Sequence, residues 1–98
     1  MEKCLSSGII TKTTKASTLV FAGHCELIAV HGVATGASVV TITDAKTAVE
    51  TGTVVFYDHQ AADHGQIDFA PGKGIDCLLG ISATVTNGDI IVYYRPLA

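Results

Sequence analysis

The chain has 98 residues and a mass of 10.1 kDa, which allows one domain, spanning residues 1–98, with a single thin core. Hydrophobic residues make up 48% of the chain and charged residues only 15%, and this composition excludes a disordered protein. No window reaches the roughly 18 consecutive apolar residues of a membrane-spanning helix, so we expect no membrane partner. The net charge of −3 and the scattered basic residues argue against a nucleic-acid partner.

The low charge also predicts how the surface behaves. A domain this small exposes much of its chain, so a surface with 6 basic and 9 acidic residues must be largely Thr, Ser, Gly and exposed aliphatic groups. Surface of that kind is typical of permanent contact with other subunits, although Thr and Gly alone could also keep it wettable. We therefore expect a homo-oligomer or a lattice-bound subunit.

The residue types favour an all-β chain. Val, Ile and Thr number 10, 9 and 12, and β-branched side chains pack well on a pleated surface. No segment has the apolar stripe of an amphipathic helix, and the 10 glycines suit many short strands joined by turns. In chain order we expect strands at 8–12, 17–22, 25–33, 38–44, 52–58, 66–70 and 75–79.

The clearest local signal lies at the C-terminal end. Asn87-Gly88 separates two runs with alternating apolar residues, and this dipeptide is typical of a two-residue hairpin turn. We therefore predict that Ile81–Thr86 pairs antiparallel with Asp89–Arg95, and that Pro96 ends the last strand. The sequence as a whole predicts a single-domain antiparallel β-sandwich, jelly-roll-like, of about eight short strands. An immunoglobulin-type domain is disfavoured because the chain has no Trp.

Histidines and cysteines raise the question of a metal site. The chain has four histidines and three cysteines, but His24 and Cys25 are adjacent and would point to opposite faces of a strand. The polar loop at 58–65 could bring His59 and His64 near two carboxylates, yet it lacks the pair spacing of a zinc site. We favour a solvated loop and expect no metal site.

Cys4, Cys25 and Cys77 are an odd number, so they cannot all be paired. We predict three reduced thiols, as in a protein made in a reducing cytoplasm, while a Cys25–Cys77 bridge remains an alternative without support from spacing.

Catalytic and cofactor motifs are missing from the sequence. There is no nucleophile elbow, and Gly72-Lys73-Gly74 resembles a phosphate loop but is not followed by Ser or Thr and a helix, so we interpret it as a turn. We expect no enzyme, no catalytic residue and no cofactor. Tyr57, Tyr93 and Tyr94 could form a sugar-stacking face, although ordinary cross-strand packing is the simpler interpretation. Tyr93 and Tyr94 are adjacent, so at most one of them packs inside.

Four segments carry a resemblance to the small β-sandwich virion proteins of tailed bacteriophages, over about residues 23–96. The segments are Gly36–Asp44, Thr51–Phe56, Pro71–Ile75 and Thr84–Arg95. The patterns they resemble are a "G-x-x-V-x-I-x-D" strand, an "x-G-T-V" strand, a "P-x-G-[IL]" turn and a closing strand that ends in two aromatic residues. The loop at 58–65 and the cysteines do not match the pattern. The resemblance implies a capsid decoration or cement subunit, or another head or tail accessory.

Two functions therefore stand as expectations. The first is a viral structural protein that binds the major capsid protein and stabilises the phage head, located in the virion and assembled as a homo-oligomer, with a trimer favoured by the resemblance. The alternative is a tail, fibre or glycan-binding module for host attachment. We expect Met1–Ser7 to precede the first strand and to reach a neighbouring subunit as an N-terminal arm.

Overall fold

The computed structural model describes residues 3–11, 18–47, 52–60 and 65–97. These residues form nine strands and no helix, so none of the described segments is a helix that could cross a membrane. The total was expected to be about eight, and each of the nine segments expected to be a strand contains one, although β7 is shorter than the expected strand at 75–79. The strands are β1 (Leu5–Thr11), β2 (Thr18–Ala22), β3 (Cys25–Ala34), β4 (Ser38–Asp44), β5 (Thr53–Gln60), β6 (Gln66–Phe69), β7 (Ile75–Cys77), β8 (Gly80–Val85) and β9 (Gly88–Pro96).

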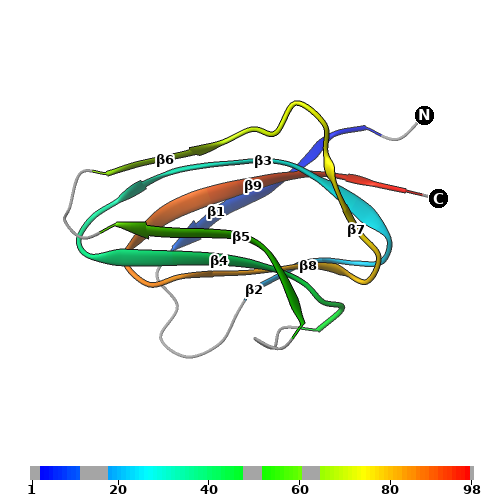
Figure 1. Ribbon diagram of the computed structural model, residues 1–98, viewed down its shortest axis with the longest axis horizontal. Helices are drawn as coiled ribbons and strands as arrows, with labels where there is room; N and C mark the ends of the chain where they lie inside the picture. Colours follow the sequence, from blue (N-terminus) through cyan, green and yellow to red (C-terminus); the bar gives the residue numbers. More distant parts are fainter. Residues whose placement is uncertain (1–2, 12–17, 48–51, 61–64, 98) are drawn as a thin grey trace.

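The strands lie in two antiparallel sheets packed face to face (Figure 1). Sheet A has the order β1-β9-β3-β6, with β7 also paired to β3, and sheet B has the order β2-β8-β4-β5. The pairs β1·β9, β2·β8, β3·β6 and β4·β5 describe one long antiparallel ribbon whose closed end is the β4–β5 hairpin. This ribbon is wrapped so that successive pairs fall in alternate sheets, which is the jelly-roll arrangement. The predicted antiparallel sandwich is confirmed.

The core lies between the two sheets because apolar residues alternate along the strands. The largest fully buried side chains include Leu27 and Val30 from sheet A and Ile42 and Ile81 from sheet B. Tyr94 is also buried, with its ring centroid 5.4 Å from that of Phe21. Tyr93 points to the other face of β9, as the alternation predicts.

The predicted C-terminal hairpin is wrong. Ile81–Thr86 largely forms β8, which pairs with β2 and β4 in sheet B, whereas Asp89–Arg95 lies in β9, which pairs with β1 and β3 in sheet A. The Asn87-Gly88 turn therefore passes from one sheet to the other. Two hydrogen bonds of Asn87 stabilise this connection between the sheets. Its side-chain amide donates to Ala37 O at 2.6 Å, and its backbone carbonyl accepts the Thr35 N–H at 3.3 Å.

The expected N-terminal arm is also corrected. The first strand begins at Leu5 rather than at Gly8, so Leu5–Ser7 pairs with β9 of the same chain. Ser7 strengthens this pairing, because its hydroxyl oxygen accepts the Val92 N–H at 3.0 Å. Residues 5–7 are thus part of sheet A, and Met1 and Glu2 lie outside the described residues.

Candidate binding surfaces

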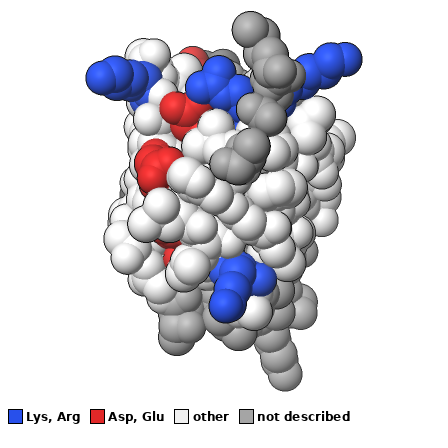
Figure 2. Space-filling view, turned by 90° about the vertical axis from the view of Figure 1, so that its right-hand side faces the viewer, with Lys and Arg blue, Asp and Glu red and all other residues white. Residues whose placement is uncertain are grey.

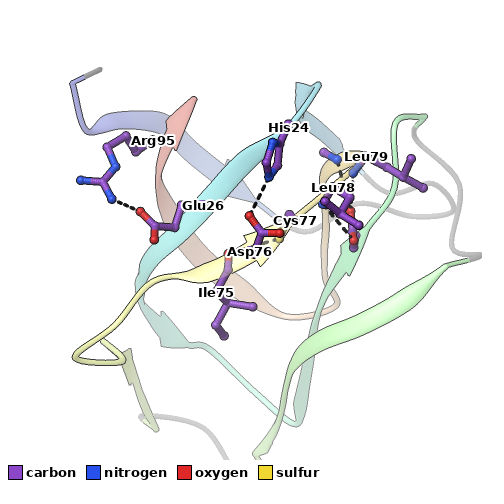
Figure 3. Close-up of polar contacts among 10 residues, drawn as sticks. His24, Glu26, Ile75, Asp76, Cys77, Leu78, Leu79 and Arg95 are labelled. Atoms are coloured by element: carbon purple, nitrogen blue, oxygen red, sulfur yellow. Dashed lines mark hydrogen bonds and ion pairs between the residues drawn. The ribbon is translucent and has the colours of Figure 1, made fainter. Parts of the chain in front are cut away.

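Two polar pairs lie at the end of sheet A where β3, β7 and β9 meet (Figure 3). His24 Nε2 is 2.6 Å from Asp76 Oδ1, and Arg95 pairs with Glu26 across β9 and β3. His24 and Asp76 are both well exposed, and exposed pairs of this kind contribute little stability. The neighbouring thiols of Cys25 and Cys77 are fully buried on the core side, so no nucleophile of this cluster reaches solvent.

The histidines do not converge in the described structure. No group of three or more His, Cys, Asp or Glu among the described residues is placed to hold a metal ion. His31 Nδ1 is 2.8 Å from Asp68 Oδ1 on the outer face of sheet A, at the opposite end from His24. His59 is exposed on β5, and its suggested partner His64 lies outside the described residues. Gly72-Lys73-Gly74 leads into strand β7 rather than a helix, which excludes a phosphate loop there.

The cysteines have a relationship that sequence spacing did not indicate. Cys25 on β3 and Cys77 on β7 are direct cross-strand partners, and both are free and fully buried. Burial raises the pKa of the Cys25 thiol to about 11, helped by the carboxylates of Asp44 and Asp76. Burial also raises the pKa of the Cys77 thiol to about 12. Cys4 is a third free thiol and is exposed.

An exposed apolar tip forms where β7 turns into β8. Leu78 and Leu79 are 65% and 48% exposed although they are adjacent large apolar residues. Asp44 at the end of β4 fixes this tip, because its carboxylate accepts the backbone N–H groups of Leu78, Leu79 and Gly80 at 3.2, 2.9 and 3.3 Å (Figure 3). A side chain at the end of β4, the strand that pairs with β8, therefore anchors the backbone of the tip.

We expect Asp44→Ala to lower the free energy of unfolding by about 2 kcal/mol, because it removes a charged acceptor shared by three N–H groups. Asp76→Ala is the matched control, since it removes an exposed carboxylate whose partner is His24, and it should cost less than about 1 kcal/mol. Urea unfolding of both variants at neutral pH gives the comparison. Equal losses in the two variants would contradict the role assigned to Asp44.

The outer face of sheet A carries an open apolar groove of ≈ 300 Å³, which we call the sheet A groove. Cross-strand register sets Ile9, Ile91 and His31 side by side on β1, β9 and β3. Ile9 is 69% exposed and Val33 is 50% exposed. The residues that line the sheet A groove are Ile9, His31, Gly32, Val33, Asp89 and Ile91.

The outer face of sheet B carries a second groove of different chemistry, the sheet B groove, with a volume of ≈ 260 Å³. It runs between β4 and β8, where Thr41 and Thr84 are cross-strand partners. Its lining residues are Val39, Thr41, Thr43, Thr84 and Thr86. The sequence signal for this groove is the pair of Thr-x-Thr segments at 41–43 and 84–86, which were not among the candidate site residues.

The tyrosines singled out from the sequence do not form one face. Tyr57 is 60% exposed on the outer face of sheet B, Tyr93 is half-buried on the outer face of sheet A, and Tyr94 lies in the core. Tyr93 packs edge-on against His31, with ring centroids 5.7 Å apart. Only Tyr57 presents most of its ring to solvent.

Charged side chains are sparse among the described residues on the face shown in Figure 2. In Figure 2, which views the end of the sandwich that bears the chain termini, uncharged residues cover most of the face and the Lys and Arg side chains stand apart from one another.

Comparison with protein-family models, curated proteins and solved structures gave no significant match for this chain.

Proposed function

We propose that the protein is a capsid decoration or cement subunit, which binds the outer surface of a phage head through the sheet A groove and stabilises the shell. The observation that carries this proposal is the exposure of Ile9 and Val33 on one outer sheet face of a protein with few charges. Contiguous exposed apolar surface on a soluble protein marks an interaction site. The partner is the major capsid protein.

The position of the sheet A groove suits docking on a flat protein lattice. Its residues come from three neighbouring strands, β1, β9 and β3, whose backbone is fixed by pairing on both sides of β9. A preformed face loses little conformational entropy when it binds. His31 and Asp89 supply the polar rim that interfaces of this kind carry around an apolar centre.

The fold supports the same class of function by analogy. Jelly rolls recur in viral capsid proteins and in lectins, and the sequence segments resemble phage virion proteins. Fold alone does not decide function, so this support is weaker than the exposed face. A homo-oligomer, with a trimer favoured, would cover part of the remaining apolar surface, which includes the Leu78–Leu79 tip.

The test is co-sedimentation with empty heads of the phage that encodes the chain. We expect Ile9→Asp to weaken head binding about 30-fold, the effect of losing about 2 kcal/mol at an interface centre. Ile9 is largely exposed, so the variant should keep its fold. Val54→Asp is the matched control, because Val54 is 51% exposed on the outer face of sheet B and should bind heads normally.

Two further measurements complete the test. Analytical ultracentrifugation of the free protein reports the oligomer, and copy number per particle separates a shell subunit, present in hundreds of copies, from a tail or fibre component. A well-behaved monomer without affinity for heads would overturn the proposal.

A further inference from the structure

The sheet B groove differs from the sheet A groove in the chemistry of its lining. Of the five described residues that line it, four are threonines and the fifth is Val39, so these residues offer hydroxyls and methyl groups but no charge. Each hydroxyl can donate one hydrogen bond and accept two. Thr86 Oγ1 already accepts the Val39 N–H at 2.8 Å, which leaves its proton free to be donated. Such a lining suits a ligand that is itself neutral and rich in hydroxyls.

An exposed aromatic ring stands beside this groove. Tyr57 on β5 is the cross-strand partner of Thr41, so the register places it on the β5 side of the threonine row. Its 60% exposure means that the ring is available for stacking. An aromatic face next to hydroxyl groups matches a pyranose ring, which has an apolar C–H face and a polar rim.

A buried hydroxyl without a partner lies at the Thr43 end of the groove. Ser82 is the cross-strand partner of Thr43, and it precedes Thr84 by two residues, so strand alternation puts it on the same face as the threonines. Ser82 is only 1% exposed, and its Oγ has no hydrogen-bond partner among the described residues. Because protein atoms cover this oxygen and Ser82 is not among the lining residues, a ligand in the groove would lie beside Ser82 without contacting its hydroxyl.

We propose that the sheet B groove binds a neutral carbohydrate, with one sugar ring stacked on Tyr57 and its hydroxyls bonded to Thr41 and Thr86. Among the described residues that line the groove there is no Lys, Arg, Asp or Glu, which favours a neutral sugar over a sialylated, sulfated or phosphorylated one. This activity goes beyond head binding and does not depend on it.

The two grooves lie on opposite faces of the molecule, because the sheets pack with their inner faces together (Figure 1). A subunit attached through the sheet A groove would therefore present the sheet B groove away from the shell. Many copies on one particle would then add avidity to a weak single site.

The probe is an array of neutral hexose and N-acetylhexosamine oligosaccharides, with sialylated and sulfated counterparts on the same surface. We expect binding to neutral members, followed by titration of the best soluble oligosaccharide against the full chain. Tyr57→Ala should weaken that binding at least 10-fold, whereas Tyr57→Phe should retain most of it because the stacking ring is kept. Thr41→Val preserves the side-chain shape, removes one hydroxyl and should also weaken binding.

The controls separate this proposal from head binding. Ile9→Asp should lose heads and keep the glycan, and Tyr57→Ala should lose the glycan and keep heads. Circular dichroism checks that both variants are folded. The proposal is overturned if no neutral glycan binds, if binding is restricted to acidic glycans, or if folded Tyr57→Ala binds as well as the parent protein.

Discussion

Substituting Gly32 by Ala is expected to lower the free energy of unfolding by about 3 kcal/mol or more, a large part of the total stability of a domain this small. Gly32 lies on β3, between Ile90 of β9 and Ile67 of β6. A Cβ atom at this position would lie 2.1 Å from Asp89 O and 2.9 Å from the Ile90 Cα. Both are backbone atoms, so no side-chain rotation can relieve the overlap and the central pair of sheet A would have to separate.

Gly72→Ala is the matched control for Gly32→Ala. A Cβ at Gly72 would meet no heavy atom within 4 Å, so this change should leave stability within about 0.5 kcal/mol of the parent protein. Urea unfolding monitored by circular dichroism measures both. If Gly32→Ala unfolds at the same urea concentration as the parent, the close approach of β3 and β9 is wrong. Gly32 also lines the sheet A groove, so the head binding that we propose for this groove predicts weaker binding by a folded Gly32→Ala variant.

Strand identity and facing direction were predictable from the sequence because they are local properties. The alternation of Ile81, Ala83 and Val85 marked the inward face of β8, and these three residues are fully buried. Strand 38–44 was predicted with the limits that it has in the structure. The adjacent pair Ile9-Ile10 gave no such signal, and in the structure Ile9 is exposed while Ile10 is buried.

Strand pairing was not predictable in the same way. In a sandwich, two consecutive strands alternate identically whether they pair with each other or face each other across the core, so the pattern around Asn87-Gly88 fits both arrangements. The turn residues indicate a reversal of direction and do not specify the sheet. The choice is made by long-range pairing, of β8 with β4 and of β9 with β3.

The candidate sites depend on that long-range register. The sheet A groove requires β1, β9 and β3 to be neighbours, and the sheet B groove requires Thr41 to lie between Thr84 and Tyr57. Tyr57 is recognisable from the sequence as a residue that could stack on a sugar, but the sequence does not place the threonines beside it. The low charge of the chain predicted exposed apolar surface in general, and the fold locates it.

The two buried thiols that the register places opposite each other should make the free energy of unfolding depend on pH. Cys25 and Cys77 lie opposite each other, both fully buried, and their thiols have pKa values raised to about 11 and about 12, chiefly by burial. In the unfolded chain a cysteine ionises near pH 8.5. Above that pH the unfolded state loses protons that the folded state still holds, so the free energy of unfolding falls as pH rises. Below about pH 8 both states hold the protons and the two thiols cause no pH dependence.

We therefore expect the protein to lose on the order of 5 kcal/mol of stability between about pH 9 and pH 12 through these two thiols, provided that both are reduced. Urea unfolding at intervals of half a pH unit, under a reducing agent, measures the slope. The double variant Cys25→Ala/Cys77→Ala should be less stable at pH 7, because it leaves small cavities, but its stability should fall much less over the alkaline range. Cys4→Ala is the control, because Cys4 is exposed and the variant should keep the full alkaline slope.

Thiol titration of the denatured, unreduced protein decides whether the premise holds. We predict about three reactive groups per chain, and only the exposed Cys4 should react quickly while the protein is folded. A count near one would mean that Cys25 and Cys77 are bridged, which their direct pairing on β3 and β7 makes the obvious alternative. In that case the unreduced protein should show no alkaline loss attributable to these residues, and the loss should return when the bridge is reduced. An alkaline slope that survives unchanged in the double variant would show that other groups cause it.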